Sequence, residues 1–552
     1  MTLTATTLGT TGNITVASNN TGVYTWASPG LTGGAPGDDT TANFSISFDS
    51  TVEAANLAAA INRTSGTLVT AVANSPSSSN VTVTAASAGA SGNGITLAET
   101  LTNFAWSGGA TALAGGADGQ PSLVACNNLY VNSGGTGLCP GTSPTVKWAY
   151  ETTSQGIGTS PVLSLDGTKV AYVESPANAA PTFHVLTIGT GAGTLAGPAI
   201  PGSGNDASDA AVTFGASGDP ISSPFVNYNS DEAYIGANDG ALHKFSGVFN
   251  GSPAEVLSGG WPLHISANAP LTSPVLDDFM GRIDIGDAKG VFFLVRTATG
   301  DNCTGAISPP CVDSTTLTLG TNSAIDDGPI LDVTNQKVYA FDAGSGTGGT
   351  NFTVTQATET LGSPVTATVG AAKTSAKGFT GAFDDKFWTV GPSSGHLYVC
   401  GTDSSSTVPA LWEVGFNGSG LMNSAGTELV LLSGANNVGC SPLTEFLNGA
   451  TDRLFVSVDT KCAFPPVNAG NDGCIISFDI TTPLTPVTAG TPAGIVDEVV
   501  GTSGIVVDNV SSSVGASSIY FSTLAGASAS APCGGVTTGG GCGVKLTQSG
   551  LQ

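Results

Sequence analysis

The sequence predicts a mainly β protein: a seven-bladed β-propeller preceded by a small N-terminal α+β domain that is rich in strands. Three observations predict it. One short motif recurs seven times from residue 159 onward. The 552-residue chain is 40% hydrophobic and contains 77 glycines, which suits a large core joined by many tight turns. The first 118 residues differ in composition, with no Lys and a single Arg, Arg63.

The N-terminal domain is predicted at residues 1–118, with one helix at about residues 50–62. Ser50 and Glu53 fit the two positions of a capping box at a helix start. Apolar residues then recur at helical spacing, namely Ala54, Leu57, Ala58 and Ile61. Strands are predicted around this helix at residues 2–7, 14–17, 68–72, 81–84 and 95–97.

This domain resembles a small β-rich domain of phage tail proteins and large bacterial surface proteins. The family pattern has a helix with A-x-N-L-A-A-A-I-N, then V-T-V-T-A and A-G-x-x-G-N-x-I-T-L. The sequence matches it with AANLAAAIN from Ala54, VTVTA from Val81 and AGASGNGITL from Ala88. The resemblance implies a domain that is found in self-assembling tails and surface proteins.

The second domain is predicted at residues 119–552 from its repeats. Each copy has a short apolar strand, an acidic turn and an alternating strand, and most copies continue into further strands. A four-stranded unit repeated seven times is typical of a β-propeller. The copies lie 50 to 63 residues apart and are counted from Ser160, Ser223, Ser273, Gly328, Thr380, Ser441 and Ser503.

The repeats resemble the PQQ-like and YVTN propeller family, whose consensus contains S-P-V, D-G and V-Y-V-G. TSPVLSLDGTKVAYVE from Thr159 and TSPVLDDF from Thr272 carry the resemblance. The last copy lacks a fourth strand, and residues 146–151 (VKWAYE) form a strand with no blade of its own. We therefore expect strand 146–151 to complete the last blade and close the ring.

Ten cysteines form five neighbouring pairs, and none occurs in a C-x-x-C motif. This pattern favours disulfides over a zinc or redox site and predicts an extracellular or cell-surface location. The expected bonds are sequential, and they join Cys126 to Cys139, Cys303 to Cys311, Cys400 to Cys440, Cys462 to Cys474, and Cys533 to Cys542.

The charge balance excludes several partners. The net charge is −26, with 14 Lys and Arg against 40 Asp and Glu. Nucleic acid and anionic membranes are therefore not expected to bind, because no cationic surface can replace their counterions. No apolar run approaches the length of a membrane span, so membrane insertion is not expected.

The sequence contains no recognisable catalytic or cofactor-binding motif. Its four histidines, His184, His243, His264 and His396, lie far apart and belong to no metal or nucleophile motif. PQQ dehydrogenases carry adjacent cysteines, which this chain lacks. We therefore predict no catalytic residue, no cofactor and no enzymatic activity.

Acidic residues follow the inner strand of each repeat, and three acidic doublets flank these strands. The main interpretation is turn formation, because an Asp side chain accepts hydrogen bonds from backbone N–H groups in an Asx-turn. Calcium binding is the alternative, since a hard cation prefers oxygen ligands. The candidates for it are Asp277, Asp278, Asp326, Asp327, Asp384 and Asp385.

These features predict a non-catalytic extracellular structural protein, a subunit of a filament or surface assembly that associates head to tail with itself. The N-terminal strand is the expected connector, through the alternating apolar residues Leu3, Ile14 and Val16. Two alternatives remain open from the sequence. One is a secreted propeller adhesin or binding module for a glycan or surface protein, and the other is a secreted propeller enzyme.

Overall fold

The computed structural model describes most of the propeller repeats and parts of the N-terminal segment. The described residues are 2–5, 50–64, 69–73, 80–85, 104–106, 121–127, 145–152, 157–174, 180–190, 193–195, 197–202, 206–215, 222–267, 269–320, 323–344, 351–372, 377–404, 408–434, 439–465, 473–498, 501–508, 518–523 and 543–547.

The chain forms two compact units. Unit 1 comprises Met1–Ala125, Trp148–Ser154 and Gly191–Ser203, and unit 2 comprises the rest of the chain. The predicted domain boundary at residues 118 and 119 lies outside the described residues.

Up to residue 106, the described residues of unit 1 form one helix and a four-stranded sheet of order β2-β3-β1-β4. Ala54 and Ala58 of the helix pack on Ala71, Val81 and Val83, all less than 6% exposed, so small side chains let the helix lie close to the sheet. The predicted strands at 14–17 and 95–97 lie outside the described residues. The elements are β1 (Thr2–Ala5), α1 (Ser50–Thr64), β2 (Val69–Ala73), β3 (Asn80–Ala85) and β4 (Phe104–Trp106).

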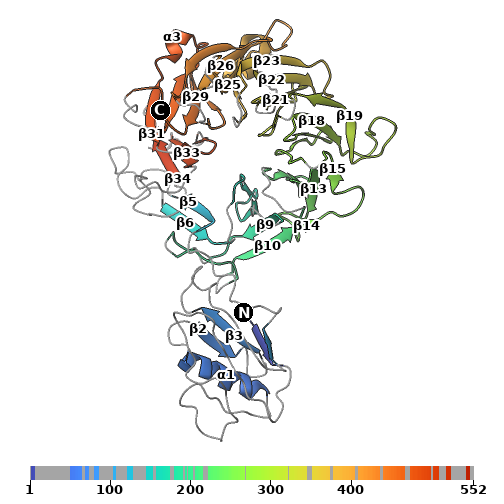
Figure 1. Cartoon of the computed structure of the whole chain (residues 1–552), viewed down its shortest axis with the longest axis vertical. Helices are drawn as coiled ribbons and strands as arrows, with labels where there is room; N and C mark the ends of the chain where they lie inside the picture. The colour runs from blue at the N-terminus through green and yellow to red at the C-terminus, as the bar shows by residue number, and fades with distance from the viewer. Residues whose placement is uncertain are drawn as a thin grey trace. The chain divides into compact units, whose positions relative to one another are not determined.

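Unit 2 contains seven antiparallel sheets in chain order, which confirms the seven blades predicted from the repeats (Figure 1). Each of the first six blades has at least four strands, and three strands of the seventh are described. Within a blade we call the strands first to fourth in chain order, and the first is the inner strand.

Blades 1 to 3 consist of β7 (Val162–Leu163), β8 (Lys169–Glu174), β9 (Thr182–Thr187) and β10 (Ser208–Thr213); β11 (Phe225–Asn227), β12 (Glu232–Gly236), β13 (Ala241–Ser246), β14 (Ala254–Glu255) and β15 (Leu263–His264); and β16 (Val275–Asp277), β17 (Arg282–Gly286), β18 (Val291–Arg296) and β19 (Cys311–Thr318). In blade 2, β14 and β15 both pair with β13.

Blades 4 to 7 consist of β20 (Ile330–Asp332), β21 (Lys337–Asp342), β22 (Asn351–Thr358) and β23 (Val365–Ala371); β24 (Ala382–Phe383), β25 (His396–Thr402), β26 (Pro409–Gly415) and β27 (Thr427–Leu431); β28 (Thr444–Asn448), β29 (Thr451–Val458), β30 (Gly473–Asp479) and β31 (Gly494–Glu498); and β32 (Val506–Asp508), β33 (Ser518–Ser522) and β34 (Gly543–Thr547). Three short helices lie in the connections of blades 5 and 6, namely α2 (Asp385–Thr389), η3 (Pro392–Ser394) and α3 (Pro486–Ala489).

Hydroxyl groups at the start of the inner strands join neighbouring blades. The N–H of Ser160 donates to Oγ of Ser223 at 3.0 Å, and the N–H of Ser223 donates to Oγ of Ser273 at 2.9 Å. The residue before two of these serines bonds within its own blade: Oγ of Ser222 accepts from the N–H of Gly236 at 2.9 Å, and Oγ1 of Thr272 accepts from the N–H of Gly286 at 3.0 Å. The recurring pair of hydroxyl residues therefore joins strands within a blade through its first residue and joins neighbouring blades through its second.

The glycine that ends the second strand is required by the close approach of the next blade. A Cβ atom on Gly236 would lie 2.7 Å from Cβ of Leu271 and 2.8 Å from the carbonyl oxygen of Thr272. Gly286 occupies the same place in blade 3, where a Cβ atom would lie 2.7 Å from Ile325. This contact explains the glycine of the V-Y-V-G pattern.

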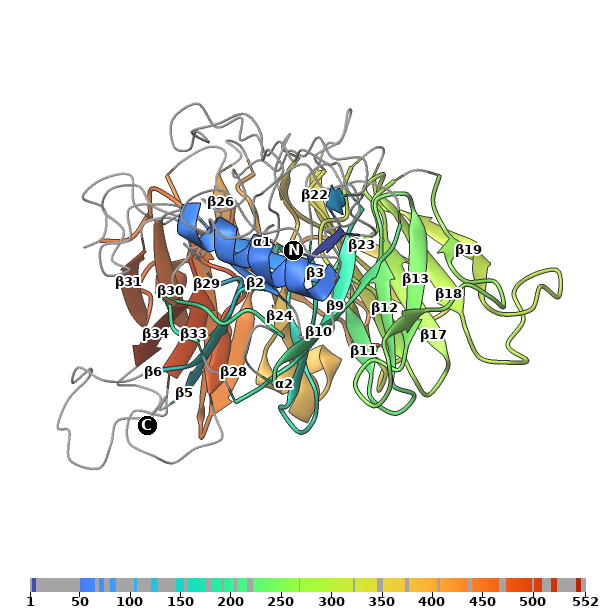
Figure 2. The same ribbon diagram turned by 90° about the horizontal axis from the view of Figure 1, so that it is seen from below.

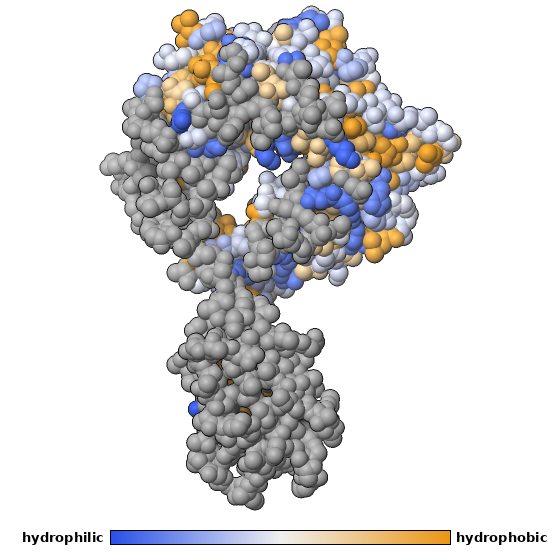
Figure 3. All heavy atoms as spheres, viewed as in Figure 1, coloured by the Kyte–Doolittle hydropathy of each residue, from blue (hydrophilic) through white to orange (hydrophobic). Residues whose placement is uncertain are grey.

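The ring of blades encloses an opening in the view of Figure 3. Leu163 of β7 and Val506 of β32 belong to inner strands and are 55% and 65% exposed, as expected for strands that border such an opening. The apolar core lies instead between the sheets of neighbouring blades.

The strand predicted at residues 146–151 forms as β6 (Thr145–Tyr150) and pairs with β5 (Leu123–Asn127). Tyr150 also makes a parallel bridge to Ala199. The described pairing of β34 is with β33. Closure of the ring by strand 146–151 therefore stays a prediction.

Three predicted disulfides are present, joining Cys303 to Cys311, Cys400 to Cys440, and Cys462 to Cys474. Cys126 lies exposed in β5, whereas Cys139, Cys533 and Cys542 lie outside the described residues. No described helix is both long and apolar enough to cross a membrane.

Candidate interaction face

Carboxylates at the end of the inner strands form the turns that the sequence predicts. Oδ1 of Asp277 accepts from the N–H of Met280 at 3.0 Å, and Oδ1 of Asp332 accepts from the N–H of Asn335 at 3.0 Å. Asp384 caps α2, and its Oδ1 accepts from the N–H of Phe387 at 3.0 Å. Each carboxylate thus satisfies a backbone donor that the turn would leave without a partner.

The second group of acidic candidates bonds across blade boundaries. Asp278 accepts from the side-chain amide of Asn227 at 2.5 Å. Asp327 accepts from the N–H of Thr380 at 3.0 Å, and Asp326 accepts from the N–H of Gly378 at 3.1 Å. These contacts join blade 2 to blade 3 and blade 4 to the segment that begins blade 5.

Asp385, the sixth candidate, bonds through its main chain, and its N–H donates to Oδ2 of Asp452 in blade 6 at 2.9 Å. Over the residues that the structure describes, no three His, Cys, Asp or Glu side chains converge on a possible cation site. The calcium alternative therefore has no described site, and turn formation and blade joining account for the doublets.

Three of the four histidines sit beside carboxylates in separate blades. Nδ1 of His184 lies 2.7 Å from Asp209, Nδ1 of His243 lies 2.6 Å from Glu255, and Nδ1 of His396 lies 3.0 Å from Asp384. His184 also stacks on Tyr172, with ring centroids 4.9 Å apart. His264, the fourth, is exposed at the end of β15. The structure does not bring the four together.

The contact between His396 and Asp384 yields a pH-dependent prediction. The hydrogen bond to Asp384 raises the pKa of His396 above its usual value. The protonated histidine therefore contributes stability that is complete below about pH 6.5 and is lost as the pH rises through the higher folded pKa. Replacing Asp384 by Asn keeps a helix cap but removes the charge, so the pKa of His396 should fall. NMR titration of the His396 imidazole measures this pKa. A pKa in D384N equal to that of the wild type would show that Asp384 is not what raises it.

Blade 3 contains a buried acid that the sequence did not single out. The side chain of Asp284 is 1% exposed, and neither carboxylate oxygen has a hydrogen-bond partner in the described structure. Burial, reinforced by the charges of Glu359 and Asp277, raises the pKa of Asp284 to about 8. Burial and the neighbouring Asp452 likewise raise the pKa of Glu445 in blade 6. Both acids favour the neutral form at neutral pH.

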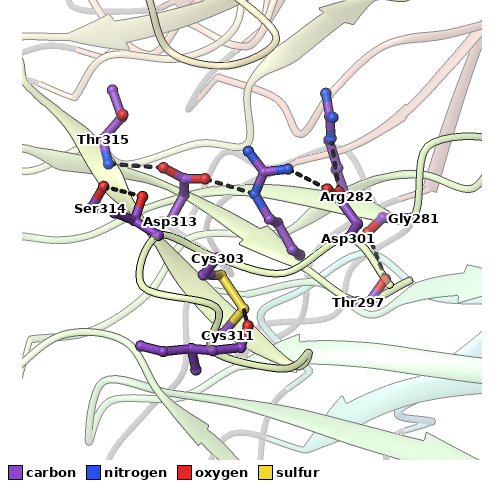
Figure 4. Close-up of a disulfide and its surroundings, with 12 residues drawn as sticks. Gly281, Arg282, Thr297, Asp301, Cys303, Cys311, Asp313, Ser314 and Thr315 are labelled. Atoms are coloured by element: carbon purple, nitrogen blue, oxygen red, sulfur yellow. Dashed lines mark hydrogen bonds and ion pairs between the residues drawn. A yellow bond between two sulfur atoms is a disulfide. The ribbon is translucent and has the colours of Figure 1, made fainter. Parts of the chain in front are cut away.

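Blade 3 also carries a charged network beside a disulfide (Figure 4). Nε of Arg296 donates to Asp313 at 2.6 Å, and Nη1 of Arg296 donates to Asp301 at 2.5 Å. Arg282 lies 3.5 Å from the same Asp301. The network joins the third and fourth strands to Asp301, which lies two residues before Cys303 in the connection between them, so these charges help to hold that long connection in place.

One end of the propeller carries an unusual set of exposed apolar side chains. The inner strands start side by side, so the connections between first and second strands all emerge at the same end, which we call the turn face. Helix α2 and the ends of β11, β17 and β28 lie at this end, along the lower edge of Figure 2. Blades 1 to 5 place exposed apolar residues in this connection, and blade 6 places one near the end of β28, just before it. We call the set the apolar ring: Leu165, Tyr228, Phe279, Val333, Trp388, Val390 and Leu447.

The exposed fraction within the apolar ring reaches its highest values at two residues. Leu165 is 84% exposed and Phe279 is 90% exposed. Connections between third and fourth strands reach the same face and add Ile307 and Val487. Among the described residues of unit 2, no exposed large hydrophobic side chain lies in a connection at the opposite end. The exposed apolar side chains of these connections thus lie at the turn face and not at the opposite end, which makes the turn face the candidate interaction face.

The sheet of unit 1 contains Leu3, one of the three residues expected to connect copies, and its role as a connector stays a prediction. Leu3 in β1 pairs with Val81 of β3 on one side and with Trp106 of β4 on the other. Neighbours within the chain thus occupy both edges of β1, and Leu3 is not on a free strand. Sequence reasoning missed this because it reads local patterns and not the pairing of distant strands. Ile14 and Val16 lie outside the described residues.

The edge of β2 is partly covered by a side chain. Nδ2 of Asn62 donates to the carbonyl oxygen of Ala71 at 2.7 Å, and the N–H of Ala71 donates to Oδ1 of Asn62 at 2.6 Å. The amide of Asn62 thus takes the place of a neighbouring strand at the centre of β2, which discourages strand addition at that point.

No family model matches the chain, and no curated protein matches it. Among solved structures, BamB from Moraxella catarrhalis is similar at 14% identity and a TM-score of 0.36, over 68% of this chain and 83% of that chain. A protein of Bacteroides fragilis NCTC 9343 described as a "putative 6-phosphogluconolactonase" is similar at 11% identity and a TM-score of 0.35, over 64% of this chain and 88% of that chain. The propeller assignment rests on the seven sheets described above.

Proposed function

We propose that this protein is a non-catalytic extracellular structural subunit whose copies join head to tail by exchanging the strand β1. The observation that carries the proposal is the position of β1. This four-residue strand fills the slot between β3 and β4 and is hydrogen-bonded on both edges. The next described element along the chain, α1, begins only at Ser50.

Strand exchange follows from this arrangement without any new contact. An exchanged element keeps the same partners, so β1 of one copy can pair with β3 and β4 of the next. The 44 residues between Ala5 and Ser50 can span at most about 150 Å, enough to reach a neighbouring molecule. Leu3 then bonds across the contact, and Ile14 and Val16 lie in the connecting segment. Repeated without closure, such a heterologous contact gives an open filament.

Two further features support the structural role. The three described disulfides suit an oxidising, extracellular environment. The acidic doublets take part in turns, a helix cap and contacts between blades. Three of the histidines bond to carboxylates of their own blades. All of these contacts stabilise the fold.

A mixed-chain crosslink tests the exchange. Thr4 and Ala105 are direct cross-strand partners, a position that suits a disulfide. Chains with T4C are mixed with chains with A105C, and the proposal expects covalent dimers on a non-reducing gel. The matched control pairs T4C with A59C on the exposed side of α1 and should give none. If T4C and A105C crosslink only when both are in one chain, β1 is not exchanged and the proposal is overturned.

A further inference from the structure

We propose that Asn417 is a site of spontaneous deamidation, at which the main-chain nitrogen of Gly418 attacks the side-chain amide and converts the asparagine to aspartate or isoaspartate. Asn417 begins the tight turn of residues 417–421, between β26 and β27 of blade 5. This turn belongs to unit 2 and takes no part in the exchange of β1, so a modification here goes beyond the proposed function.

The reaction needs water and no other reactant. The nitrogen of Gly418 bonds to Cγ of Asn417, its proton passes to the side-chain nitrogen, and ammonia leaves. Water then opens the resulting succinimide ring at one of its two carbonyl carbons. Opening at Cγ breaks the new bond and gives aspartate. Opening at the main-chain carbon breaks the original peptide bond and gives isoaspartate, in which the main chain runs through the former side chain.

Both reacting groups are accessible to solvent. Asn417 and Gly418 are exposed. Among the described residues, the N–H of Gly418 has no hydrogen-bond acceptor, so no bond must break before the nitrogen reacts. A Cβ atom placed on Gly418 would meet nothing within 4 Å, so the space beside the attacking nitrogen is open.

Two main-chain donors already hold the oxygen on which charge develops. Oδ1 of Asn417 accepts from the N–H of Ser419 at 2.9 Å and from the N–H of Leu421 at 3.1 Å. When the nitrogen of Gly418 attacks Cγ, negative charge develops on this oxygen. Donors that are fixed beforehand stabilise that charge in the transition state, as an oxyanion hole does. The fold of the turn therefore favours the reaction.

The same four residues occur a second time in the chain without these donors. Phe-Asn-Gly-Ser stands at residues 249–252 and again at residues 416–419. Asn250 is exposed, as Asn417 is, and its main-chain N–H donates to Asp231 at 3.0 Å. Over the described part of the chain, however, the side-chain oxygen of Asn250 accepts no hydrogen bond. Since the local sequence is the same, Asn250 is a matched comparison within one molecule.

Isoaspartate at position 417 loosens a contact between blades 4 and 5. Gln356 of β22 is 1% exposed, and its Nε2 donates to the carbonyl oxygen of Gly420 at 3.1 Å. Its Oε1 accepts from the N–H of Met422 at 2.9 Å. Isoaspartate adds one carbon to the main chain of the turn, which moves Gly420 and Met422 relative to this amide. The buried polar atoms of Gln356 then lose their partners, which is unfavourable.

Peptide mapping of the full-length protein by mass spectrometry tests the site. The protein is kept at about pH 8 and about 37 °C, either folded or unfolded in urea, and the conversion of Asn417 and Asn250 is followed. In the folded protein Asn417 should convert on the order of tenfold faster than Asn250, the effect of about one hydrogen bond to a charged group. In urea the two rates should be similar, because neither side chain keeps its donors.

The variant G418A provides the second arm of the test. Its Cβ atom meets no neighbour, so the turn should keep its fold, but the methyl group hinders attack by the adjoining nitrogen. Conversion at Asn417 should slow several-fold, and conversion at Asn250 should stay the same. A folded protein in which Asn417 converts no faster than Asn250, or a G418A variant that converts at the wild-type rate, would overturn the proposal.

Discussion

Replacing Asp284 with Asn should stabilise the protein at pH 8 and have little effect at pH 4. In the unfolded chain Asp ionises near pH 4, whereas burial raises the pKa of Asp284 in the folded protein to about 8. Between these values the folded state binds one more proton, so stability falls as the pH rises. The loss is on the order of 5 kcal/mol by pH 8. Asn has the shape of the neutral acid and cannot ionise, so the D284N variant avoids this loss of stability.

Urea unfolding of D284N and wild type at pH 4, 6 and 8 measures this effect. The difference in unfolding free energy should grow steadily with pH. The exposed Asp479 provides the matched control D479N, which makes the same chemical change at the end of β30. A difference for D284N that is the same at pH 4 and pH 8 would show that Asp284 does not hold its proton in the folded protein.

Removing the disulfide between Cys400 and Cys440 should give the second large effect. Cys400 lies in β25 of blade 5, and Cys440 lies in the segment that leads to β28 of blade 6, so the bond joins two blades. It closes a loop with a sequence separation of 40 residues, which restricts the unfolded chain and corresponds to about 4 kcal/mol. The double variant C400A/C440A leaves no unpaired thiol at either position, and its free energy of unfolding should fall by this amount.

The bond between Cys303 and Cys311 provides an internal comparison. It closes a loop with a separation of only 8 residues, for which the same relation gives about 2.6 kcal/mol. Chemical unfolding without reductant should therefore rank C400A/C440A below C303A/C311A in stability. The opposite order would mean that loop closure is not what this disulfide contributes.

The repeats were predictable because the blades share the same local contacts. The hydroxyl pair at Ser222 and Ser223 bonds its own blade and the next, and the glycine at Gly236 avoids a clash with Leu271. These contacts demand particular residue types at fixed places, so they leave a visible pattern in the sequence. The same logic made the Asp277 and Asp332 turns predictable.

The remaining features depend on contacts between distant residues. Asp284 occupies the polar position of an alternating strand, between Ile283 and Ile285, where the sequence pattern predicts an exposed side chain. Only the structure shows that this face of the strand is buried too and that the charge of Glu359 in blade 4 acts on Asp284. The apolar ring also has no sequence signature, since its members are single residues in separate turns. The position of β1 between β3 and β4 could not be predicted from local sequence patterns either.

Negative-stain electron microscopy of the full-length protein tests the central claim most directly. The account predicts linear polymers at about 0.15 M salt, where the repulsion between copies of charge −26 is screened beyond about 8 Å. An excess of a peptide of residues 1–17 should shorten them, because it fills the slot between β3 and β4, whereas a scrambled peptide should not. Discrete monomers at every salt concentration between 0.05 and 0.5 M would contradict a structural role through self-association.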